Sequence, residues 1–195
     1  MKQDVRTRFA FLIFISLVLY GCGGDLPTPK PVGYFRLDIP EPSYVQKNPD
    51  CPFRFEISQH SRLEFFADRG EYCWFDINYP QLNAKVHITY KPLNENLGGH
   101  IEHARSMVYE HQIKASGITS KVINRPYSKV YGLTYSLDGQ VASPYQFYLT
   151  DSTGHFLRGS LYFEARPNPD SLQPALDYVK RDMEYFIDHF EWSEK

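Results

Sequence analysis

Residues 131–163, YGLTYSLDGQVASPYQFYLTDSTGHFLRGSLYF, decide the fold class because apolar and polar side chains alternate in three consecutive segments. The three segments are residues 131–137, 145–149 and 157–163. Alternation with a period of two is typical of half-buried strands. Asp138-Gly139 and the run 151–154 supply turn residues between the segments. Because short hairpin links imply antiparallel pairing, we expect an antiparallel meander here.

The same alternation recurs in the first half of the chain. The strands expected there are residues 34–39, 53–58, 63–66, 73–79 and 85–90. Residues 40–52 are polar and contain four prolines, so we expect a loop there. In the segment 73–79, Cys73 shares the apolar face with Phe75, whereas Trp74 points to the other side.

Two segments follow the helical period instead. In residues 101–115 the apolar face is formed by Ile101, Ala104, Val108, Gln112 and Ala115. Gly117 stands where a helix C-cap glycine belongs. In residues 172–190 the stripe is Leu172, Leu176, Val179, Met183, Phe186 and Phe190. Asp170 or Ser171 can cap this second helix.

The order of elements is strands, a helix, a meander of strands and a final helix. We therefore expect an α+β fold with a mainly antiparallel sheet and two helices packed on it. The layout resembles the α/β/α sandwiches of the PsbP and Mog1 type, which is an analogy of fold and not of function.

The N-terminus has the pattern of an export signal. Lys2, Arg6 and Arg8 precede an apolar run, 9–20, that is too short to span the ~30 Å hydrocarbon core of a bilayer. The run ends in Leu19-Tyr20-Gly21-Cys22, which resembles the bacterial lipobox Leu-x-Gly-Cys. The resemblance implies that Cys22 receives a diacylglycerol and becomes the mature N-terminus.

Three parts of the chain follow from this pattern. We expect a lipoprotein signal peptide in residues 1–21, a lipidated, proline-rich tether in residues 22–33 and a single domain in residues 34–195. The lipid would anchor the domain to a membrane. Gly23-Gly24-Asp25 lacks the acidic run that is associated with surface-exposed lipoproteins in some phyla, so we expect the periplasmic face of the outer membrane.

Charge and cysteine content narrow the function classes. The formal net charge of −2 gives no reason to expect nucleic acid as a partner. If Cys22 carries the lipid, only Cys51 and Cys73 remain. In an oxidising compartment an isolated pair usually forms a disulfide, so we predict a Cys51–Cys73 bridge, with two buried free thiols as the alternative.

Candidate catalytic and metal-binding residues do not form a recognised pattern. His100, His103 and His111 lie in one predicted helix, but the spacing is not His-Glu-x-x-His, and a solvated helix face is the better interpretation. Asp151, Ser152 and His155 have the residue types of a hydrolytic triad, but one tight turn does not place them in line. The sequence therefore predicts no enzyme, no metal and no cofactor.

Five longer strings together resemble one family. They are Lys30–Arg36, Cys51–Glu56, Asn78–Lys91, Asp151–Gly159 and Pro167–Leu172. Together they resemble the gliding motility-associated lipoprotein family GldD of the Bacteroidota. The resemblance implies a lipoprotein required for gliding and for the type IX secretion system, acting beside other gliding lipoproteins and the secretion machinery. It implies no activity, and it assigns Cys22 to lipidation and Cys51 and Cys73 to a pair.

Two further interpretations stay open. Asp151-Ser152-Thr153 and Asp170-Ser171-Leu172 also resemble the short O-glycosylation pattern of this phylum, although turn and capping chemistry explains both places. A glycan- or peptidoglycan-binding lipoprotein is the alternative to an assembly or stabilising factor. Its support is the presence of aromatic residues expected to be exposed, such as Trp74.

Overall fold

The computed structural model describes residues 40–66, 72–164 and 169–193, all within the compact unit Gly33–Lys195. The predicted signal peptide, the tether 22–33 with Cys22, and the predicted strand 34–39 lie outside the described residues. They stay predictions, as does the predicted domain boundary at residue 34.

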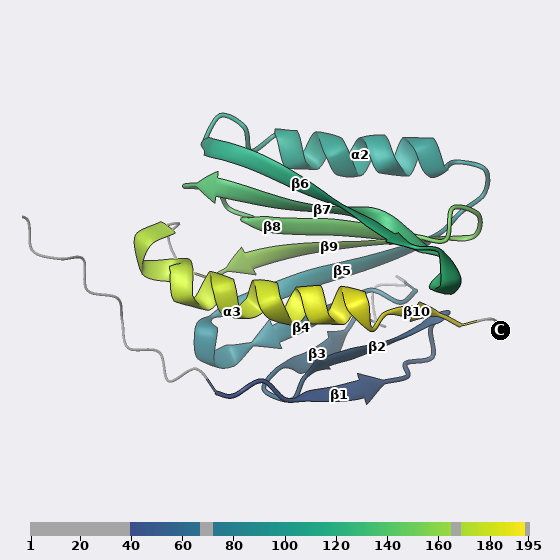
Figure 1. The fold of residues 1–195 in the computed structure, drawn as a ribbon, viewed down its shortest axis with the longest axis horizontal. Coiled ribbons are helices and arrows are strands. Elements are labelled where there is room, and N and C mark those ends of the chain that lie inside the picture. The colour runs from purple at the N-terminus through teal and green to yellow at the C-terminus, as the bar shows by residue number, and fades with distance from the viewer. Residues whose placement is uncertain (1–39, 67–71, 165–168, 194–195) are drawn as a thin grey trace, which may run out of the picture. The chain divides into compact units, whose positions relative to one another are not determined.

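The centre of the domain is an antiparallel sheet of seven strands (Figure 1). In sheet order the strands are β3 (Arg62–Phe65), β4 (Phe75–Tyr79), β5 (Ala84–Pro92), β9 (His155–Phe163), β8 (Tyr145–Thr150), β7 (Val130–Gly139) and β6 (Ala115–Arg125). Each neighbouring pair is antiparallel, and β9-β8-β7 is the meander that the alternation in 131–163 predicts. Gly159 permits close packing there, because a Cβ on it would lie 2.3 Å from the Phe147 ring of β8.

A small antiparallel sheet and two helices complete the fold. The small sheet contains β1 (Tyr44–Lys47), β2 (Phe53–Ser58) and β10 (Glu191–Trp192), in the order β1-β2-β10. The helices are α2 (Leu97–Tyr109) and α3 (Pro169–Asp188), and the short 3-10 turns are η2 (Pro80–Leu82) and η3 (Pro126–Ser128). The structure thus confirms the predicted α+β class with two helices on a mainly antiparallel sheet.

The two helices cover opposite faces of the large sheet. Phe147 belongs to the core cluster that contains Val179, Met183 and Phe186 of α3. Its chain neighbour Tyr148 belongs to a second, smaller cluster that contains Ala104 and Val108 of α2. Because consecutive strand residues point to opposite faces, α3 packs on one side of the sheet and α2 on the other.

The Cys51–Cys73 disulfide is present, with 5.8 Å between the two Cα atoms. It joins the segment just before β2 to the segment just before β4, and therefore links the small sheet to the large one. Cys73 is buried as predicted, but it does not belong to the strand face of β4. It precedes the strand at a φ of 58°, in the left-handed region.

Several predicted boundaries are wrong. The predicted loop 40–52 contains β1, which pairs with β2 through its backbone. The predicted helix 101–115 ends at Tyr109, because Ala115 already pairs with Gly139 in the β6–β7 ladder. Gly117 therefore lies in β6 and is not a C-cap. Helix α3 begins at Pro169, before the predicted cap, and Phe190 lies beyond its end.

Neither helix in the described ranges combines the length and the apolarity that crossing a membrane requires.

Candidate functional site

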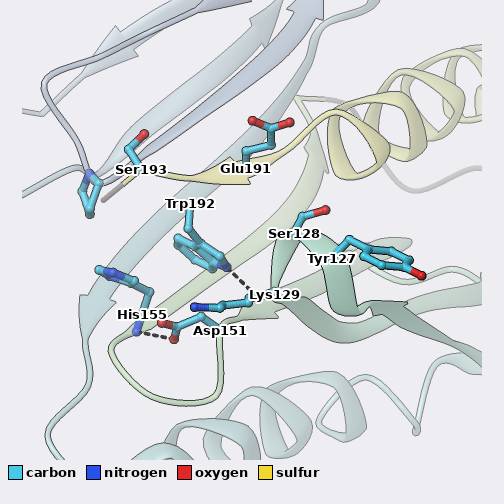
Figure 2. Close-up of a pocket in the computed structure, with 9 residues that line it drawn as sticks. Tyr127, Ser128, Lys129, Asp151, His155, Glu191, Trp192 and Ser193 are labelled. Carbon is cyan, nitrogen blue, oxygen red and sulfur yellow. Dashed lines mark hydrogen bonds between the residues drawn. The ribbon is translucent and has the colours of Figure 1, made fainter. Parts of the chain in front are cut away.

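A pocket of about 960 Å³ lies where the C-terminal strand β10 passes near the β8–β9 turn and η3 (Figure 2). It brings together four segments that are far apart in the chain. The lining residues are Pro52, Tyr127, Ser128, Lys129, Asp151, His155, Glu191, Trp192 and Ser193.

Strand β10 is held in place by pairing with β2. Glu191 and Trp192 lie opposite Arg54 and Phe53 in the antiparallel register. The Arg54 guanidinium also donates a hydrogen bond from Nε to Glu191 at 2.7 Å. Strand β10 and Pro52, the residue before β2, line this side of the pocket. Pro52 follows Cys51 of the disulfide directly.

Trp192 and His155 form the aromatic part of the pocket. Their rings stack with centroids 5.0 Å apart, and the Trp192 indole N–H donates to the Lys129 carbonyl oxygen at 3.1 Å. On its other side, His155 Nδ1 lies 2.8 Å from the Tyr90 hydroxyl. Burial raises the pKa of Tyr90 to about 12. The phenol therefore keeps its proton at neutral pH, and its hydroxyl is the hydrogen-bond partner of His155 Nδ1.

Asp151 is the organising residue of the β8–β9 turn. Its Oδ1 accepts the backbone N–H groups of Thr153, Gly154 and His155 at 3.0, 2.9 and 2.8 Å. Burial raises the pKa of the Asp151 carboxyl, but these N–H groups outweigh burial and hold the pKa below its usual 3.8. Ser152 occupies the exposed left-handed position of the turn at a φ of 72°.

The three triad-type residues share a turn but do not form a triad. Asp151 binds the backbone N–H of His155 and not its imidazole ring (Figure 2). The imidazole Nδ1 is bonded to Tyr90, so no contact links an oriented base to Ser152. The turn chemistry that the sequence predicts for Asp151 is confirmed. Ser171, the other residue in a glycosylation-like string, is half-buried in α3.

The predicted solvated histidines are spread over different surroundings. His100 stacks on Phe156 with centroids 5.3 Å apart, and His103 is exposed on α2. His111 lies beyond the end of the helix. In the part of the chain that the structure describes, no group of three or more His, Cys, Asp and Glu side chains could hold a metal ion.

Trp74 is not the exposed aromatic that the sequence suggests. It is half-buried, and its indole N–H donates to the Tyr90 carbonyl oxygen at 2.8 Å. Lys91 Nζ lies 4.4 Å from the centre of its ring. Cation–π contact with Lys91 therefore occupies a ring face that a sugar would need.

Sequence reasoning missed a polar row on the large sheet. Asp76, His87, Ser160 and Gln146 are cross-strand neighbours in the registers of β4, β5, β9 and β8. The available signal was the polar face of four predicted strands. The pairing register brings these faces together, and the individual strands do not encode it.

The fold and the pocket together define a class of protein: a small α+β domain with an open pocket lined by aromatic and charged side chains. A model of the family described as gliding motility lipoprotein GldD matches residues 24–192, and the chain belongs to this family. The family resemblance of the sequence strings is thereby confirmed. The protein is a membrane-anchored lipoprotein of the cell envelope that is associated with gliding motility.

Comparisons with individual proteins add little. No curated protein sequence matches the chain. A structural alignment pairs it with the solution structure of cyanobacterial PsbP (CyanoP) from Synechocystis sp. PCC 6803, with 10% sequence identity and a TM-score of 0.45. The alignment covers 83% of this chain and 99% of that chain. At this TM-score we draw no inference from it.

Proposed function

We propose that this lipoprotein acts by docking, without turnover, as an assembly or stabilising factor of the gliding and type IX secretion machinery. The site of action is the periplasmic face of the outer membrane, where Cys22 holds the domain. Family membership supports the association with gliding. The observation that supports the non-catalytic role is that structural contacts already engage the two triad-type groups of the pocket, Asp151 and His155. Asp151 is held by backbone N–H groups and His155 by Tyr90.

The accessible side chains of the pocket suit protein recognition. Tyr127 is fully exposed beside the pocket, and Lys129 next to it is exposed. Trp192 is half-buried, with one ring face against His155. Tyrosine and tryptophan are enriched among the residues that dominate binding at protein interfaces. A rim lysine favours a partner with acidic groups by steering its approach. We therefore expect a protein partner with an apolar segment flanked by acidic residues.

Crosslinking in living cells tests this proposal. A photo-crosslinking amino acid replaces Tyr127 in the full lipoprotein, and the matched control carries it at Tyr109, which is 44% exposed on α2. We expect one abundant product at position 127, containing a periplasmic component of the secretion or gliding machinery. A product found only at position 109, or cell wall as the main product at 127, would overturn the docking site.

A further inference from the structure

The polar row on the α2 side of the large sheet contains two unpaired buried groups. Gln146 and Ser160 are each 1% exposed and lie opposite each other in the β8–β9 register. Neither Gln146 Nε2 nor Ser160 Oγ has a hydrogen-bond partner. Leaving a buried polar group unsatisfied costs about 1–3 kcal/mol. Because the two residues lie opposite each other on neighbouring strands, one bound group can pair with both of them.

Arg158 fixes the orientation of the Gln146 amide. Its Nη2 donates to Gln146 Oε1 at 2.6 Å. Because a guanidinium only donates, the amide oxygen must face Arg158 and the NH₂ group must face away from it. The place beside Gln146 and Ser160 thus presents amide N–H donors, a hydroxyl and a nearby guanidinium, so it selects a group with acceptor oxygens.

The charges along the row limit the ligand to a single negative charge. At the far end of the row, buried Asp76 is bonded to His87 Nδ1 and lies 3.8 Å from Lys85 Nζ. Lys85 is shared with Glu164 at 3.2 Å, so this end carries no surplus of positive charge. Arg158 forms no ion pair with a carboxylate among the described residues. One unpaired guanidinium balances one negative charge, and the Asp76 carboxylate disfavours a second.

We propose that Arg158, Gln146 and Ser160 form a binding site for a carboxylate group on the sheet face opposite α3. A carboxylate is planar, carries one negative charge and accepts from guanidinium, amide and hydroxyl donors together. Its source is either a small carboxylic acid or the carboxyl group of a peptide. This site is separate from the pocket at β10 and does not depend on docking there.

A catalytic role does not fit the row, although Asp76, His87 and Ser160 have the residue types of a triad. Ser160 Oγ does not hydrogen-bond to His87, so no base is placed to take its proton. Strand β9 is paired on both sides, with β5 and with β8. Its backbone N–H groups are therefore used in the two ladders and leave no oxyanion hole.

The primary test follows the Gln146 side-chain amide signal of the full lipoprotein in detergent, labelled with ¹⁵N-glutamine. The test ligands are sodium acetate and a short peptide with a free carboxyl terminus. The controls are the amidated form of that peptide, inorganic phosphate and sodium chloride, all at equal ionic strength. We expect acetate or the free peptide to shift the signal saturably, and the amidated peptide, phosphate and chloride to leave it unchanged. A shift with acetate indicates a small acid, and a shift with the free peptide alone indicates a peptide carboxyl group. No saturable shift with either carboxylate, or an equal shift with phosphate, would overturn the site.

Variants test which residues bind. Gln146→Glu replaces the donor by a carboxylate that pairs with Arg158, so the protein is expected to stay folded while carboxylate affinity falls at least tenfold. Ser160→Ala is expected to weaken binding about tenfold, corresponding to one lost hydrogen bond. Ser120→Ala, an exposed position at the β6 end of the same row, is the control. The readout is the rise in Tm with acetate over chloride. Full stabilisation of Gln146→Glu by acetate would contradict the proposal, as would ester hydrolysis that disappears in Ser160→Ala.

Discussion

The two faces of the seven-stranded sheet differ in how completely they are covered. On the α3 face, β2, β4, β5, β8 and β9 contribute to one large aromatic and aliphatic core with the helix. On the α2 face, a smaller apolar cluster forms around Tyr148 and Phe156. The same face also carries the polar row from Asp76 to Gln146. Strands β4, β5, β8 and β9 of the large sheet build both faces by alternation, so the two faces differ although they share the same strands. The α3 face carries the larger apolar core, and the α2 face combines a smaller core with buried polar groups.

The largest expected effect is on the α3 face. Phe186 is fully buried and its ring lies 5.0 Å from Phe55 and 5.9 Å from Phe147. Phe186→Ala should lower the free energy of unfolding by about 3–5 kcal/mol, measured by urea denaturation. Phe65→Ala is the control, because that ring is 44% exposed, and we expect a clearly smaller loss. Equal losses at the two positions would contradict the account of a buried aromatic core against α3.

The disulfide is expected to rank second. It closes a loop with a sequence separation of 22 between Cys51 and Cys73. In the chain-entropy model a loop of this size contributes about 3 kcal/mol. The double variant Cys51→Ser/Cys73→Ser should lose that amount in urea denaturation, and adding a reductant should change the wild type and leave the variant unaffected. Reduction of the disulfide has to be verified first. If the wild type is then equally stable with and without reductant, the disulfide does not make this contribution.

The Asp151 turn should give a smaller loss that depends on pH. Its carboxyl pKa is below 3.8 in the folded protein, so its contribution is present above pH 3.8 and is lost as the pH falls through the folded pKa. At neutral pH, Asp151→Ala should cost about 2 kcal/mol, since hydrogen bonds to a charged group are lost. The measurement is denaturation of both proteins from neutral to acidic pH. If the difference between them grows on acidification, the account of this turn is wrong.

Buried Asp182 on the α3 side should show the opposite sign. It is 0% exposed, its Oδ1 accepts from the Tyr44 hydroxyl at 3.0 Å, and burial raises its pKa above 3.8. Its favourable state is the protonated one, so stability is fully present below pH 3.8 and falls as the pH rises through the folded pKa. Asp182→Asn should flatten this fall, whereas exposed Asp177→Asn should not. A profile for Asp182→Asn that matches wild type would refute this assignment.

Strands whose side chains are buried could be predicted from the sequence, and strands held by backbone alone could not. In β8, Tyr145, Phe147 and Leu149 alternate into the core and reveal the strand. Most side chains of β6 are exposed, with Val122 at 70%, so pairing with β7 holds a strand that shows no apolar alternation. The short strand β10 is fixed by the partner strand β2, which sequence periodicity does not report.

The candidate sites also divide into one that a local sequence pattern predicts and two that it does not. The Asp151 turn is local, so the turn residues predict it from the sequence. The pocket requires β10, η3 and the β8–β9 turn to meet, and the polar row requires four strands in register. Both depend on long-range contacts that no local pattern encodes. Lipidation of Cys22 is also predicted from a local pattern, although it lies outside the described residues. Lipid labelling tests this prediction, because the Cys22→Ala variant should lose the label.

Complementation of a strain that lacks the gene is the most direct test of docking without turnover. Loss of the gene should stop gliding and retain secreted cargo together. Ser152→Ala and His103→Ala should each restore both functions, while the pair Tyr127→Ala/Lys129→Glu should restore neither, with all variants accumulating and folding normally. His155→Ala is judged only if it folds, because His155 stacks on Trp192. The account would be contradicted by the opposite pattern. In that pattern, a folded and abundant Ser152→Ala or His103→Ala variant loses both functions, while Tyr127→Ala/Lys129→Glu stays fully active.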